Sequence, residues 1–544
     1  MTISSQGFAD IAPTVTTELQ LLLKTGSSAK GSKNLYTDLM RKATPNKVAI
    51  RTFDGLHYTY RDLASASARI AHFIKGLGLT PGSRVAARVE KSPEALMLYL
   101  ACLRSGMVFL PLNTGYQSEE LRYFFNDAKP GLIVCDPSAH QWITPLAESL
   151  GCKYVETLGS DISGSLLQKA APLPDQFPTV NCGPDALAAI LYTSGTTGRS
   201  KGAMLTHGNL ASNALVLHHA WRWESNDVLI HALPIFHVHG LFVAIHGVLR
   251  AGAQMIWMSK FDAKAVVSAF DQATLLMGVP TFYVRLVESG LLSAERVKKM
   301  RLFISGSAPL LAETHQAFTQ LTGHSILERY GMSETVMLTS NPYDGKRRAG
   351  TVGFALPSVE LRLVDDQGTV IKPTLGHESA IGGVQVRGPN VFVGYWNMPE
   401  KTKEEFAQGG WFKTGDMGQF AADGYLILVG RSKDLIISGG YNVYPKEMEL
   451  LLDDQPEIYE SAVIGLPHPD FGEAVTAVVV PEPPQKATRM GPEDEAKLLT
   501  RLRPMIAGFK LPKRIFFMDE LPRNAMGKVQ KNVLREHFIS TFKA

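Results

Sequence analysis

Cysteine is scarce in this sequence. Of 544 residues four are cysteine, at Cys102, Cys135, Cys152 and Cys182, and none stands in a Cys-x-x-Cys pair. That scatter argues against a structural zinc site, a disulfide framework or a thioredoxin-like couple. Reduced cytosol is the simplest setting, and the first twenty residues lack the basic flank and apolar centre of a signal peptide. We therefore expect a cytoplasmic protein.

A strong charge of either sign is also missing. The 55 basic and 51 acidic residues leave a formal net charge of +4, and no run of five or six like charges occurs. Such a balance gives no field that would attract a polyanion. We expect no nucleic-acid partner.

Long apolar runs are rare, and one of them resembles a membrane span. Residues 228–249 contain no Asp, Glu, Lys or Arg, but they contain four histidines, two glycines and Pro234. Four imidazoles are costly in hydrocarbon, and a proline interrupts a helix. We expect a buried strand, a loop and a helix here, and no membrane partner.

The order of apolar runs predicts an α/β fold. From Asn34 to about Pro280, runs such as "LAAILYT" alternate with helical patterns such as "EALMLYLACLRSG", which is typical of βαβ units around parallel sheets. Near Val359 the pattern changes to short alternating strands separated by Gly, Asp and Pro. After Arg431 helices and strands mix again, as in a compact α+β domain.

The length of the chain requires more than one hydrophobic core. We expect an N-terminal extension (1–33) and a large domain (34–430), the latter with a β-rich subdomain at about 350–430. A small α+β C-terminal domain (431–544) should follow.

A glycine-rich stretch, "TSGTTGRSKG", follows the apolar run that ends at Tyr192. Glycines let backbone N–H groups converge on phosphate oxygens, and hydroxyls and a lysine add donors and charge. The stretch therefore suits a polyphosphate. Its candidate residues are Thr193, Ser194, Gly195, Thr196, Thr197, Gly198, Arg199, Ser200 and Lys201.

The spacing differs from that of a P-loop, which has four residues between its glycines and a lysine directly after the second. Here two residues separate Gly195 from Gly198, and Lys201 comes three positions later. A flexible linker is the alternative, but linkers seldom follow a buried strand.

Taken with five further motifs, the stretch closely resembles the adenylate-forming superfamily, which includes acyl-CoA synthetases, adenylation domains of peptide synthetases, and luciferases. The motifs occur in order over nearly the whole chain after Asn34. They are "SGSAPL" (305–310), "ERYGMSET" (328–335), "WFKTGD" (411–416), "GRSKDLIISGGYNVYP" (430–445) and "PRNAMGKVQK" (522–531). The resemblance implies ATP, Mg²⁺ and coenzyme A as cofactor and co-substrates, with an acyl-adenylate intermediate.

The resemblance also implies roles for single residues. Glu334, beside the hydroxyl of Ser333, would hold Mg²⁺ with Thr193, because this hard cation prefers oxygen ligands. Lys528 would neutralise charge that grows in the transition state. The ATP-binding set further includes Arg329 and Gly331. The resemblance places Gly306, Ser307, Ala308 and Tyr330 around the adenine, Asp416 at the ribose, and Arg431 near the ribose and the phosphates. Without the motifs, Glu334 could be a surface acid, Asp416 a turn residue and Lys528 a solvated lysine.

The second half-reaction implies a hinge and a thiol site. By resemblance the small domain turns about Lys433, and the loop with Gly439, Gly440 and Tyr441 receives the pantetheine arm of CoA. The stretch "LTGHSI" mimics a carrier-protein attachment site, but no separate four-helix unit surrounds it. Lys528 is also a candidate target of a lysine acetyltransferase, since acetylation would remove its cation.

Two stretches bear on the acid. "LPIFHVHG" supplies His237 and His239, which could be metal ligands although no third ligand stands at useful spacing. "GVPTFYVRLV" supplies Arg285 on a helix expected to begin near Pro280. An arginine on an apolar helix surface is costly to bury unless it meets an anion; its alternatives are pairing with Glu288 or an outward position.

These stretches, with "MLTSNPYDGKRRAGTVGFALP", look most like malonyl-CoA synthetases within the superfamily. The resemblance implies a small dicarboxylate substrate, malonate and also methylmalonate, with Arg285 and His237 at the substrate carboxylate. The alternative is a short- or medium-chain fatty acyl-CoA synthetase in which Arg285 is structural.

Overall fold

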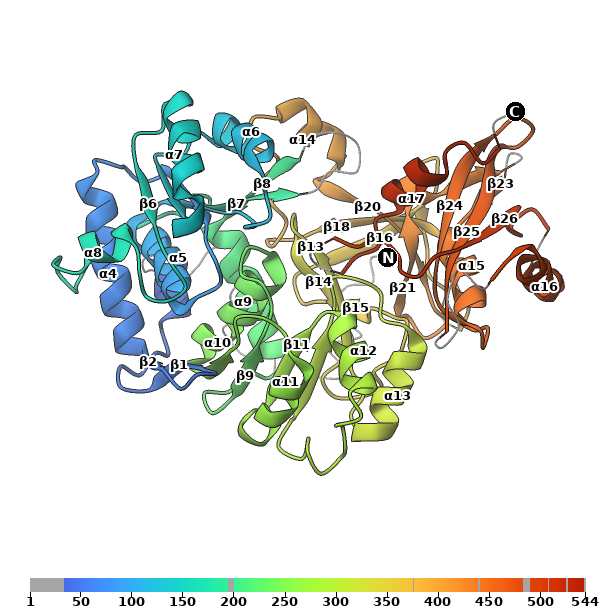
Figure 1. The fold of residues 1–544 in the computed structure, drawn as a ribbon, viewed down its shortest axis with the longest axis horizontal. Coiled ribbons are helices and arrows are strands. Elements are labelled where there is room, and N and C mark those ends of the chain that lie inside the picture. Colours follow the sequence, from blue (N-terminus) through green and yellow to red (C-terminus); the bar gives the residue numbers. More distant parts are fainter. Residues whose placement is uncertain are drawn as a thin grey trace. The chain divides into compact units, whose positions relative to one another are not determined.

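The structure of the protein is a computed structural model (Figure 1). It describes residues 34–193, 200–374, 376–438, 441–482, 490–506, 508–524 and 527–542. By internal packing these residues divide into a larger unit, 34–360 with 386–412, and a smaller unit, 361–385 with 413–542. The domain boundary expected near Arg431 remains a prediction.

One sheet of the larger unit has the strand order β15-β14-β13-β12-β11-β9-β10-β1-β2. Its central strands pair in parallel, and its two ends close with antiparallel pairs. The strands are β15 (Phe354–Ala355), β14 (Val336–Ser340), β13 (Leu327–Met332), β12 (Leu302–Ser305), β11 (Leu275–Gly278), β9 (Val228–His231), β10 (Gln254–Trp257), β1 (Val48–Thr52) and β2 (His57–Thr59).

A second sheet has the order β6-β5-β3-β4-β7-β8. Every pair in it is parallel except the β7–β8 hairpin. The strands are β6 (Val155–Thr157), β5 (Leu132–Cys135), β3 (Arg84–Arg88), β4 (Val108–Pro111), β7 (Leu187–Thr193) and β8 (Lys201–Thr206). The expectation of parallel βαβ units is confirmed.

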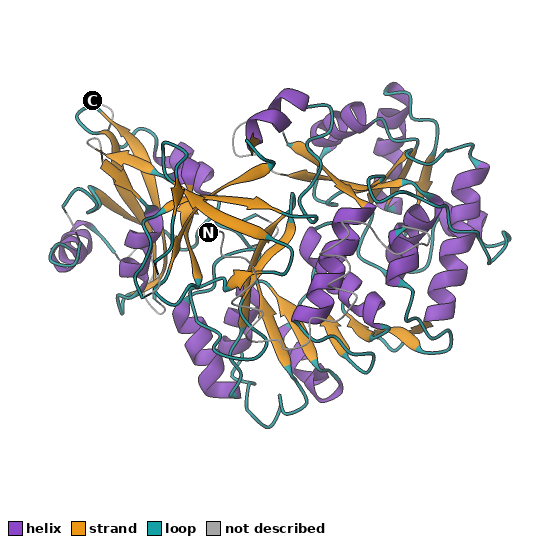
Figure 2. Cartoon of the chain, turned by 180° about the vertical axis from the view of Figure 1, so that it is seen from behind, coloured by secondary structure: helices purple, strands orange, loops and turns teal. Residues whose placement is uncertain are grey.

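Helices connect these strands, and helices and strands alternate through the larger unit (Figure 2). Helix α12 contacts α11, α13 and β11. The helices are α3 (Leu35–Leu39), α4 (Tyr60–Gly76), α5 (Pro93–Ser105), α6 (Ser118–Ala128), α7 (His140–Ser149), α8 (Ser165–Ala170), α9 (His207–Ala220), α10 (His246–Ala251), α11 (Ala263–Ala269), α12 (Pro280–Glu288), α13 (Ala312–Thr322) and α14 (Pro399–Glu405).

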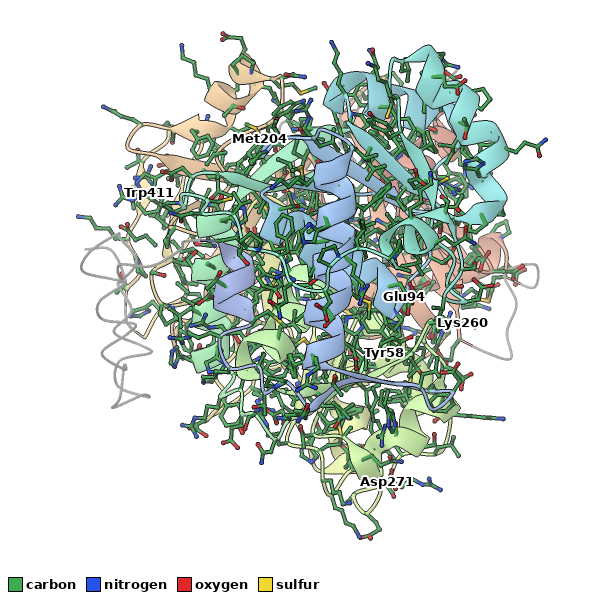
Figure 3. All side chains as sticks on the ribbon, turned by 90° about the vertical axis from the view of Figure 1, so that its left-hand side faces the viewer. Tyr58, Glu94, Met204, Lys260, Asp271 and Trp411 are labelled. Atoms are coloured by element: carbon green, nitrogen blue, oxygen red, sulfur yellow. The ribbon has the colours of Figure 1, made fainter. Side chains whose placement is uncertain are left out.

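Local sequence explains where the main helices begin. Helix α5 starts at the N-cap Ser92 with a proline in its first turn, and it ends at Gly106, whose φ of 74° suits a glycine C-cap. All of its residues are buried. Its Glu94 accepts a hydrogen bond of 2.7 Å from Tyr58 of β2, and both are labelled in Figure 3.

The apolar run at residues 228–249 forms β9, a loop, a π-helix (η2, His239–Ile245) and the start of α10. The expected strand, loop and helix are therefore confirmed. Among the helices of the described residues, none is both long and apolar enough to cross a membrane. A π-helix is rare and is often found at functional sites.

A further sheet has the order β17-β16-β18-β20-β19, with β21 paired to β20. These strands provide the expected β-rich part. They are β17 (Val370–Ile371), β16 (Glu360–Val364), β18 (Gly382–Arg387), β20 (Trp411–Phe420), β19 (Phe406–Ala407) and β21 (Leu426–Arg431).

A last sheet has the order β23-β22-β25-β24, with β26 parallel to β25. Side chains alternate along β24 and β25, so each face of the sheet has a core of its own. Val463 and Val479 pack with α15 and α16, while Ile464 and Val478 pack with α17. The elements are β22 (Ile436–Ser438), β23 (Tyr441–Val443), β24 (Ile458–His468), β25 (Gly472–Pro481), β26 (Arg514–Phe517), α15 (Pro445–Asp453), α16 (Pro492–Leu502) and α17 (Lys531–Phe538).

Candidate active site

In the sequence, the glycine-rich stretch begins at the end of β7 and ends at the start of β8, the two strands of the β7–β8 hairpin. Thr193 and Lys201 are register partners at the end of that hairpin, and the Thr193 hydroxyl donates to the Lys201 carbonyl over 3.4 Å. The carbonyl of Ser200 accepts a 2.8 Å hydrogen bond from Tyr123. The predicted phosphate-binding residues 194–199 lie outside the described residues. Thr193, Ser200 and Lys201, which flank them in the sequence, are described.

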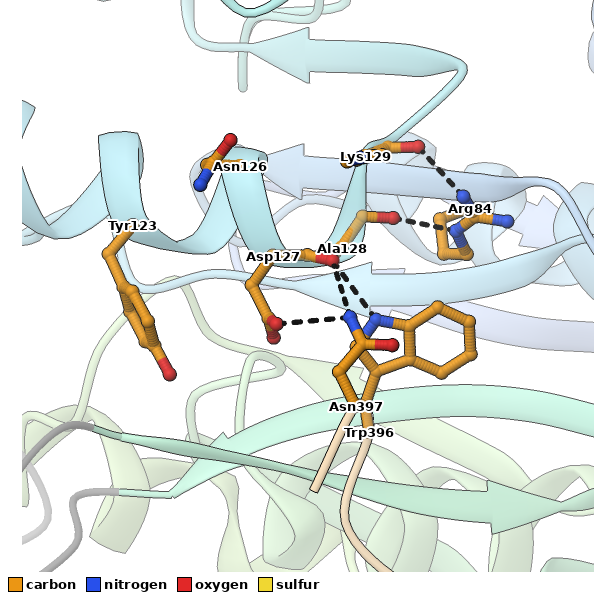
Figure 4. Close-up of a pocket in the computed structure, with 8 residues that line it drawn as sticks. All are labelled: Arg84, Tyr123, Asn126, Asp127, Ala128, Lys129, Trp396 and Asn397. Carbon is orange, nitrogen blue, oxygen red and sulfur yellow. Dashed lines mark hydrogen bonds between the residues drawn. The ribbon is translucent and has the colours of Figure 1, made fainter. Parts of the chain in front are cut away.

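A pocket beside this hairpin is lined by residues of β3, α6 and the segment after β18 (Figure 4). Its polar groups satisfy one another: Arg84 donates to the carbonyls of Ala128 and Lys129 at 2.7 and 3.0 Å. The backbone N–H of Trp396 in turn donates to the Gly202 carbonyl at 2.8 Å. Trp396, which lines the pocket, therefore holds β8 of the hairpin through this hydrogen bond.

Tyr395 joins Lys201 to Glu334. The Lys201 ammonium lies 4.5 Å from the centroid of the Tyr395 ring, and the tyrosine hydroxyl donates to Glu334 Oε1 at 2.9 Å. Lys201 also lies 3.5 Å from Glu405. Sequence reasoning missed Tyr395, because "GYWN" has no charged or glycine-spaced pattern that would mark a site.

The surroundings of Glu334 fit a magnesium site. The residue is 5 % exposed, and a buried carboxylate beside the hydroxyls of the "YGMSET" turn offers the oxygen ligands that Mg²⁺ prefers. Mg²⁺ usually takes one or two carboxylates together with phosphate oxygens. In the described part of the chain no three His, Cys, Asp or Glu side chains gather as a metal cage, so His237 and His239 find no third ligand there.

The turn that carries Ser333 and Glu334 is tightly constrained. A Cβ at Gly331 would overlap the carbonyl oxygen of Val336, so glycine is required where β13 turns into β14. Val336 itself has φ of 54°, an unusual conformation for a β-branched residue. Strain of this kind persists where the surrounding structure fixes it, commonly at functional sites.

The residues predicted around the adenine follow β12 and lie on β13. Gly306 is buried, Ser307 and Ala308 are half-buried, and Ser307 has φ of 76°. Tyr330 and Arg329 are both buried on β13. Arg329 lies directly against Gly306, where an added Cβ would overlap its guanidinium carbon.

Arg285 lies on the exposed face of helix α12. Helix α12 begins at Pro280 as expected, and Tyr283 and Leu286 are buried on it. Arg285 itself is exposed, because it lies on the face that turns away from the packed side of α12. This is the outward position that the sequence left open, and the role of Arg285 at the substrate carboxylate remains a prediction.

In the smaller unit, Asp416 and Arg431 are register partners on β20 and β21. Arg431 Nε lies 2.8 Å from Asp416 Oδ1, and Asp416 is 6 % exposed. Arg431 also donates to the Thr414 carbonyl at 3.2 Å. The pair therefore holds the Asp416 carboxylate in one orientation, and its role at the ribose remains a prediction.

Lys528 lies close to this pair. It follows Gly527, whose φ is 75°, and its backbone exchanges hydrogen bonds of 2.9 and 3.0 Å with Asn524. The side chain retains solvent exposure, yet partial desolvation lowers its pKa, as does Arg431, while Asp416 and Asp434 oppose this. The structure thus brings together three residues that the sequence predicted for one site.

Lys433 occupies a short 3₁₀ helix (η4, Ser432–Asp434) directly after β21. Partial burial, together with Arg431 and Lys528, lowers the pKa of Lys433 to about 8 against the opposing effect of Asp434. Tyr441 is exposed and stacks on Phe509, with ring centroids 4.6 Å apart. Gly439 and Gly440 lie outside the described residues.

Comparison with known proteins identifies the family. The AMP-binding enzyme family matches residues 40–396, and the AMP-binding enzyme C-terminal domain matches residues 447–528. The chain therefore belongs to the AMP-binding enzyme family.

Individual relatives extend over most of the chain. Malonate–CoA ligase of Arabidopsis thaliana is 34% identical, over 90% of this chain and 86% of the relative. Indoleacetate–CoA ligase of Aromatoleum aromaticum is 36% identical, over 90% and 95%. The crystal structure of ATP-bound MatB from Rhodopseudomonas palustris has a TM-score of 0.90 and 53% identity, covering 94% of this chain and all of that one.

The protein is an AMP-forming acyl-CoA ligase with the adenylate-forming fold, as the motifs predicted. Its cofactors and co-substrates are ATP, Mg²⁺ and coenzyme A.

Replacing Tyr395 with Phe tests the link between Tyr395 and Glu334. The variant loses the hydroxyl that holds Glu334 but keeps the ring beside Lys201. A hydrogen bond to a charged group contributes ~1.5–3 kcal/mol, so the Mg²⁺ concentration for half-maximal AMP formation should rise about tenfold or more. Tyr58→Phe is the matched control, since it removes a tyrosine–carboxylate bond elsewhere. An unchanged Mg²⁺ dependence in Tyr395→Phe would contradict the link.

Replacing Lys433 with Pro tests the hinge. Proline fixes φ near −65°, so it should restrict a rotation between half-reactions. We expect thioester formation to slow more than adenylation, with the two measured as CoA-dependent AMP release and ATP–pyrophosphate exchange. Lys433→Ala, which keeps backbone freedom, should be close to wild type. Equal slowing of both half-reactions by the proline would count against the hinge.

Proposed function

We propose that this chain is an ATP-dependent malonate–CoA ligase that also accepts methylmalonate. One carboxylate of the acid attacks the α-phosphorus of ATP, pyrophosphate leaves, and the acyl-adenylate then reacts with the CoA thiol to give the thioester and AMP. The observation that carries the choice of acid is the similarity to malonate–CoA ligases at 33–34% identity along the chain.

Residues of the larger unit serve the phosphates in this proposal. Lys201, fixed at the base of the glycine-rich stretch, lies near the β- and γ-phosphates. Glu334, oriented by Tyr395, holds Mg²⁺ with Thr193. Mg²⁺ would neutralise charge on the phosphates as pyrophosphate departs.

Residues of the smaller unit serve the nucleoside and the reacting centre. Asp416, held by Arg431, accepts hydrogen bonds from the ribose hydroxyls. Lys528 supplies a cation to the α-phosphate and the attacking carboxylate as negative charge develops. Its proposed acetylation would remove that cation.

The distal carboxylate of malonate is assigned to Arg285 and His237. Arg285 is exposed on α12, where a small charged substrate could reach it. A guanidinium is suited to a carboxylate because two parallel N–H groups match its two oxygens.

A substrate panel separates this proposal from a fatty acyl-CoA synthetase. CoA-dependent AMP formation should be fastest with malonate, slower with methylmalonate, and weak with acetate and octanoate. Faster turnover of octanoate or acetate than of malonate would replace the proposal with the fatty-acid alternative.

Replacing Arg285 with Ala should raise the KM for malonate about 10-fold to 100-fold, the loss expected for a charge-assisted bidentate contact of ~1.5–3 kcal/mol. The KM for ATP should stay within about twofold, since this guanidinium is not assigned to the nucleotide. Arg296→Ala, another exposed arginine of the same unit, is the matched control. Unchanged use of malonate by Arg285→Ala would remove Arg285 from the assignment.

A further inference from the structure

Helix α6 contacts the chain on both sides of the glycine-rich stretch. Residues 194–199 lie outside the described residues, and Tyr192 and Ser200 stand before and after them in the sequence. The hydroxyl of Tyr192 donates to Asp127 Oδ2 at 2.5 Å, and the hydroxyl of Tyr123 donates to the Ser200 carbonyl at 2.8 Å. One helix therefore holds the chain on both sides of the residues predicted to bind phosphate.

The two holding residues share one face of α6. Tyr123 and Asp127 are four positions apart, which makes them neighbours on a helix surface, and both point to the same side of α6 in Figure 4. Phe124 is 2 % exposed and packs on Tyr192, with ring centroids 4.4 Å apart. The contact between α6 and β7 thus combines aromatic packing with a hydrogen bond, and together they fix the direction of the Tyr192 side chain.

The hydroxyl of Tyr192 can act only as a donor to Asp127. Burial, followed by the hydrogen bond to Asp127, raises the pKa of Tyr192, so the phenol stays protonated at pH 7. A hydrogen bond to a carboxylate is stronger than one between neutral groups. Of the two contacts that α6 makes, the one before the stretch is therefore the stronger.

The ends of α6 are themselves fixed. At its start the Gln117 N–H donates to Glu120 at 2.9 Å. At its end Lys129 has φ of 45°, and Arg84 of β3 donates to the carbonyls of Ala128 and Lys129. Such terminal carbonyls have no partner within a helix. With these groups bound, α6 is a firm support for the hairpin.

Asp127 also holds the segment that carries Tyr395. Nε1 of Trp396 donates to the Asp127 carbonyl at 3.1 Å, and Nδ2 of Asn397 donates to that carbonyl and to Asp127 Oδ1 at 3.1 and 3.2 Å (Figure 4). Tyr395, the residue before Trp396, donates to Glu334. Asp127 therefore connects α6 both to β7 and to the segment that orients Glu334.

The glycine at position 202 lets these groups come together. Gly202 is the register partner of Tyr192 on the β7–β8 hairpin. A Cβ at Gly202 would lie 2.9 Å from Ile190, 3.3 Å from Cβ of Trp396 and 3.4 Å from the ring of Tyr192. A larger residue would force these side chains apart, so the hairpin, α6 and the segment at Trp396 pack as one body.

We propose that Asp127 and Tyr123 are positioning residues for ATP. By holding the chain on both sides of the glycine-rich stretch, they keep its N–H groups and Lys201 in the arrangement that the β- and γ-phosphates require. The inference rests on the proposed role of that stretch at the phosphates. Backbone donors bind phosphate when they converge on it, and a segment that must first be ordered binds more weakly.

The test compares binding of MgATP with binding of AMP, which lacks the β- and γ-phosphates. Calorimetric titration of the full chain without acid or CoA gives both dissociation constants, because no turnover follows. In Tyr123→Phe and in Tyr192→Phe the Kd for MgATP should rise about threefold to tenfold, the loss expected for one hydrogen bond. The Kd for AMP should stay within about twofold. Each variant keeps its aromatic ring and hence its packing.

Matched variants separate positioning from general damage. Asp127→Asn keeps an oxygen that can accept from Tyr192, so it should bind MgATP more tightly than Asp127→Ala. Tyr60→Phe removes a tyrosine–carbonyl bond of 2.7 Å to Ala253, and Tyr58→Phe removes a tyrosine–carboxylate bond, both elsewhere in the larger unit. These two controls should leave the ratio of the two dissociation constants unchanged.

Two results would overturn the inference: a Kd for MgATP within twofold of wild type in both Tyr123→Phe and Tyr192→Phe, or equal weakening of MgATP and AMP. Lys201→Ala is titrated alongside, so that the two proposals fail separately. If Lys201→Ala binds MgATP as tightly as wild type, the proposed role of the stretch at the phosphates is wrong. If Lys201→Ala binds MgATP more weakly and the tyrosine variants do not, the role of α6 alone is wrong.

Discussion

Two opposite charges buried on one hairpin, Arg329 on β13 and Glu334 in the turn to β14, are the constraint on which the candidate active site depends. An isolated charge is expensive to remove from water unless a partner or a ligand compensates it. Tyr395 holds Glu334 from one side, and two nitrogens of Arg329 have no partner within the described chain. We therefore interpret both charges as groups kept in position for a ligand of opposite sign.

The backbone around the hairpin keeps these charges in place before any ligand binds. Gly331 allows the close approach of Val336, and Gly306 allows that of Arg329. Ser307 and Val336 both have positive φ, a strain that the packed sheet maintains. Pre-organisation of this kind lowers the reorganisation needed when substrates arrive.

Much of this could be predicted from the sequence. The ordered motifs identified the family, and the alternation of apolar runs predicted the parallel sheets that were observed. Asp416, Arg431 and Lys528 are separated by up to 112 positions, yet they lie together as the motifs implied.

Other features depend on packing that no local pattern records. Tyr395 reaches Glu334 only because the segment after β18 lies beside β8, where Ala203 and Tyr395 form an isolated bridge. The positions of Arg285 and Arg329 were also beyond sequence reasoning. Arg285 lies on the outer face of α12, whereas strand alternation and Gly306 place Arg329 inside.

The central claim is that the enzyme adenylates a dicarboxylate and selects it by its second charge. ATP–pyrophosphate exchange, measured with Mg²⁺ and without CoA, tests this most directly because it reports the first half-reaction alone. The account predicts exchange that requires malonate and is at least about tenfold slower with propionate, a difference of ~1.4 kcal/mol. Equal exchange with the two acids, or no exchange until CoA is added, would contradict it.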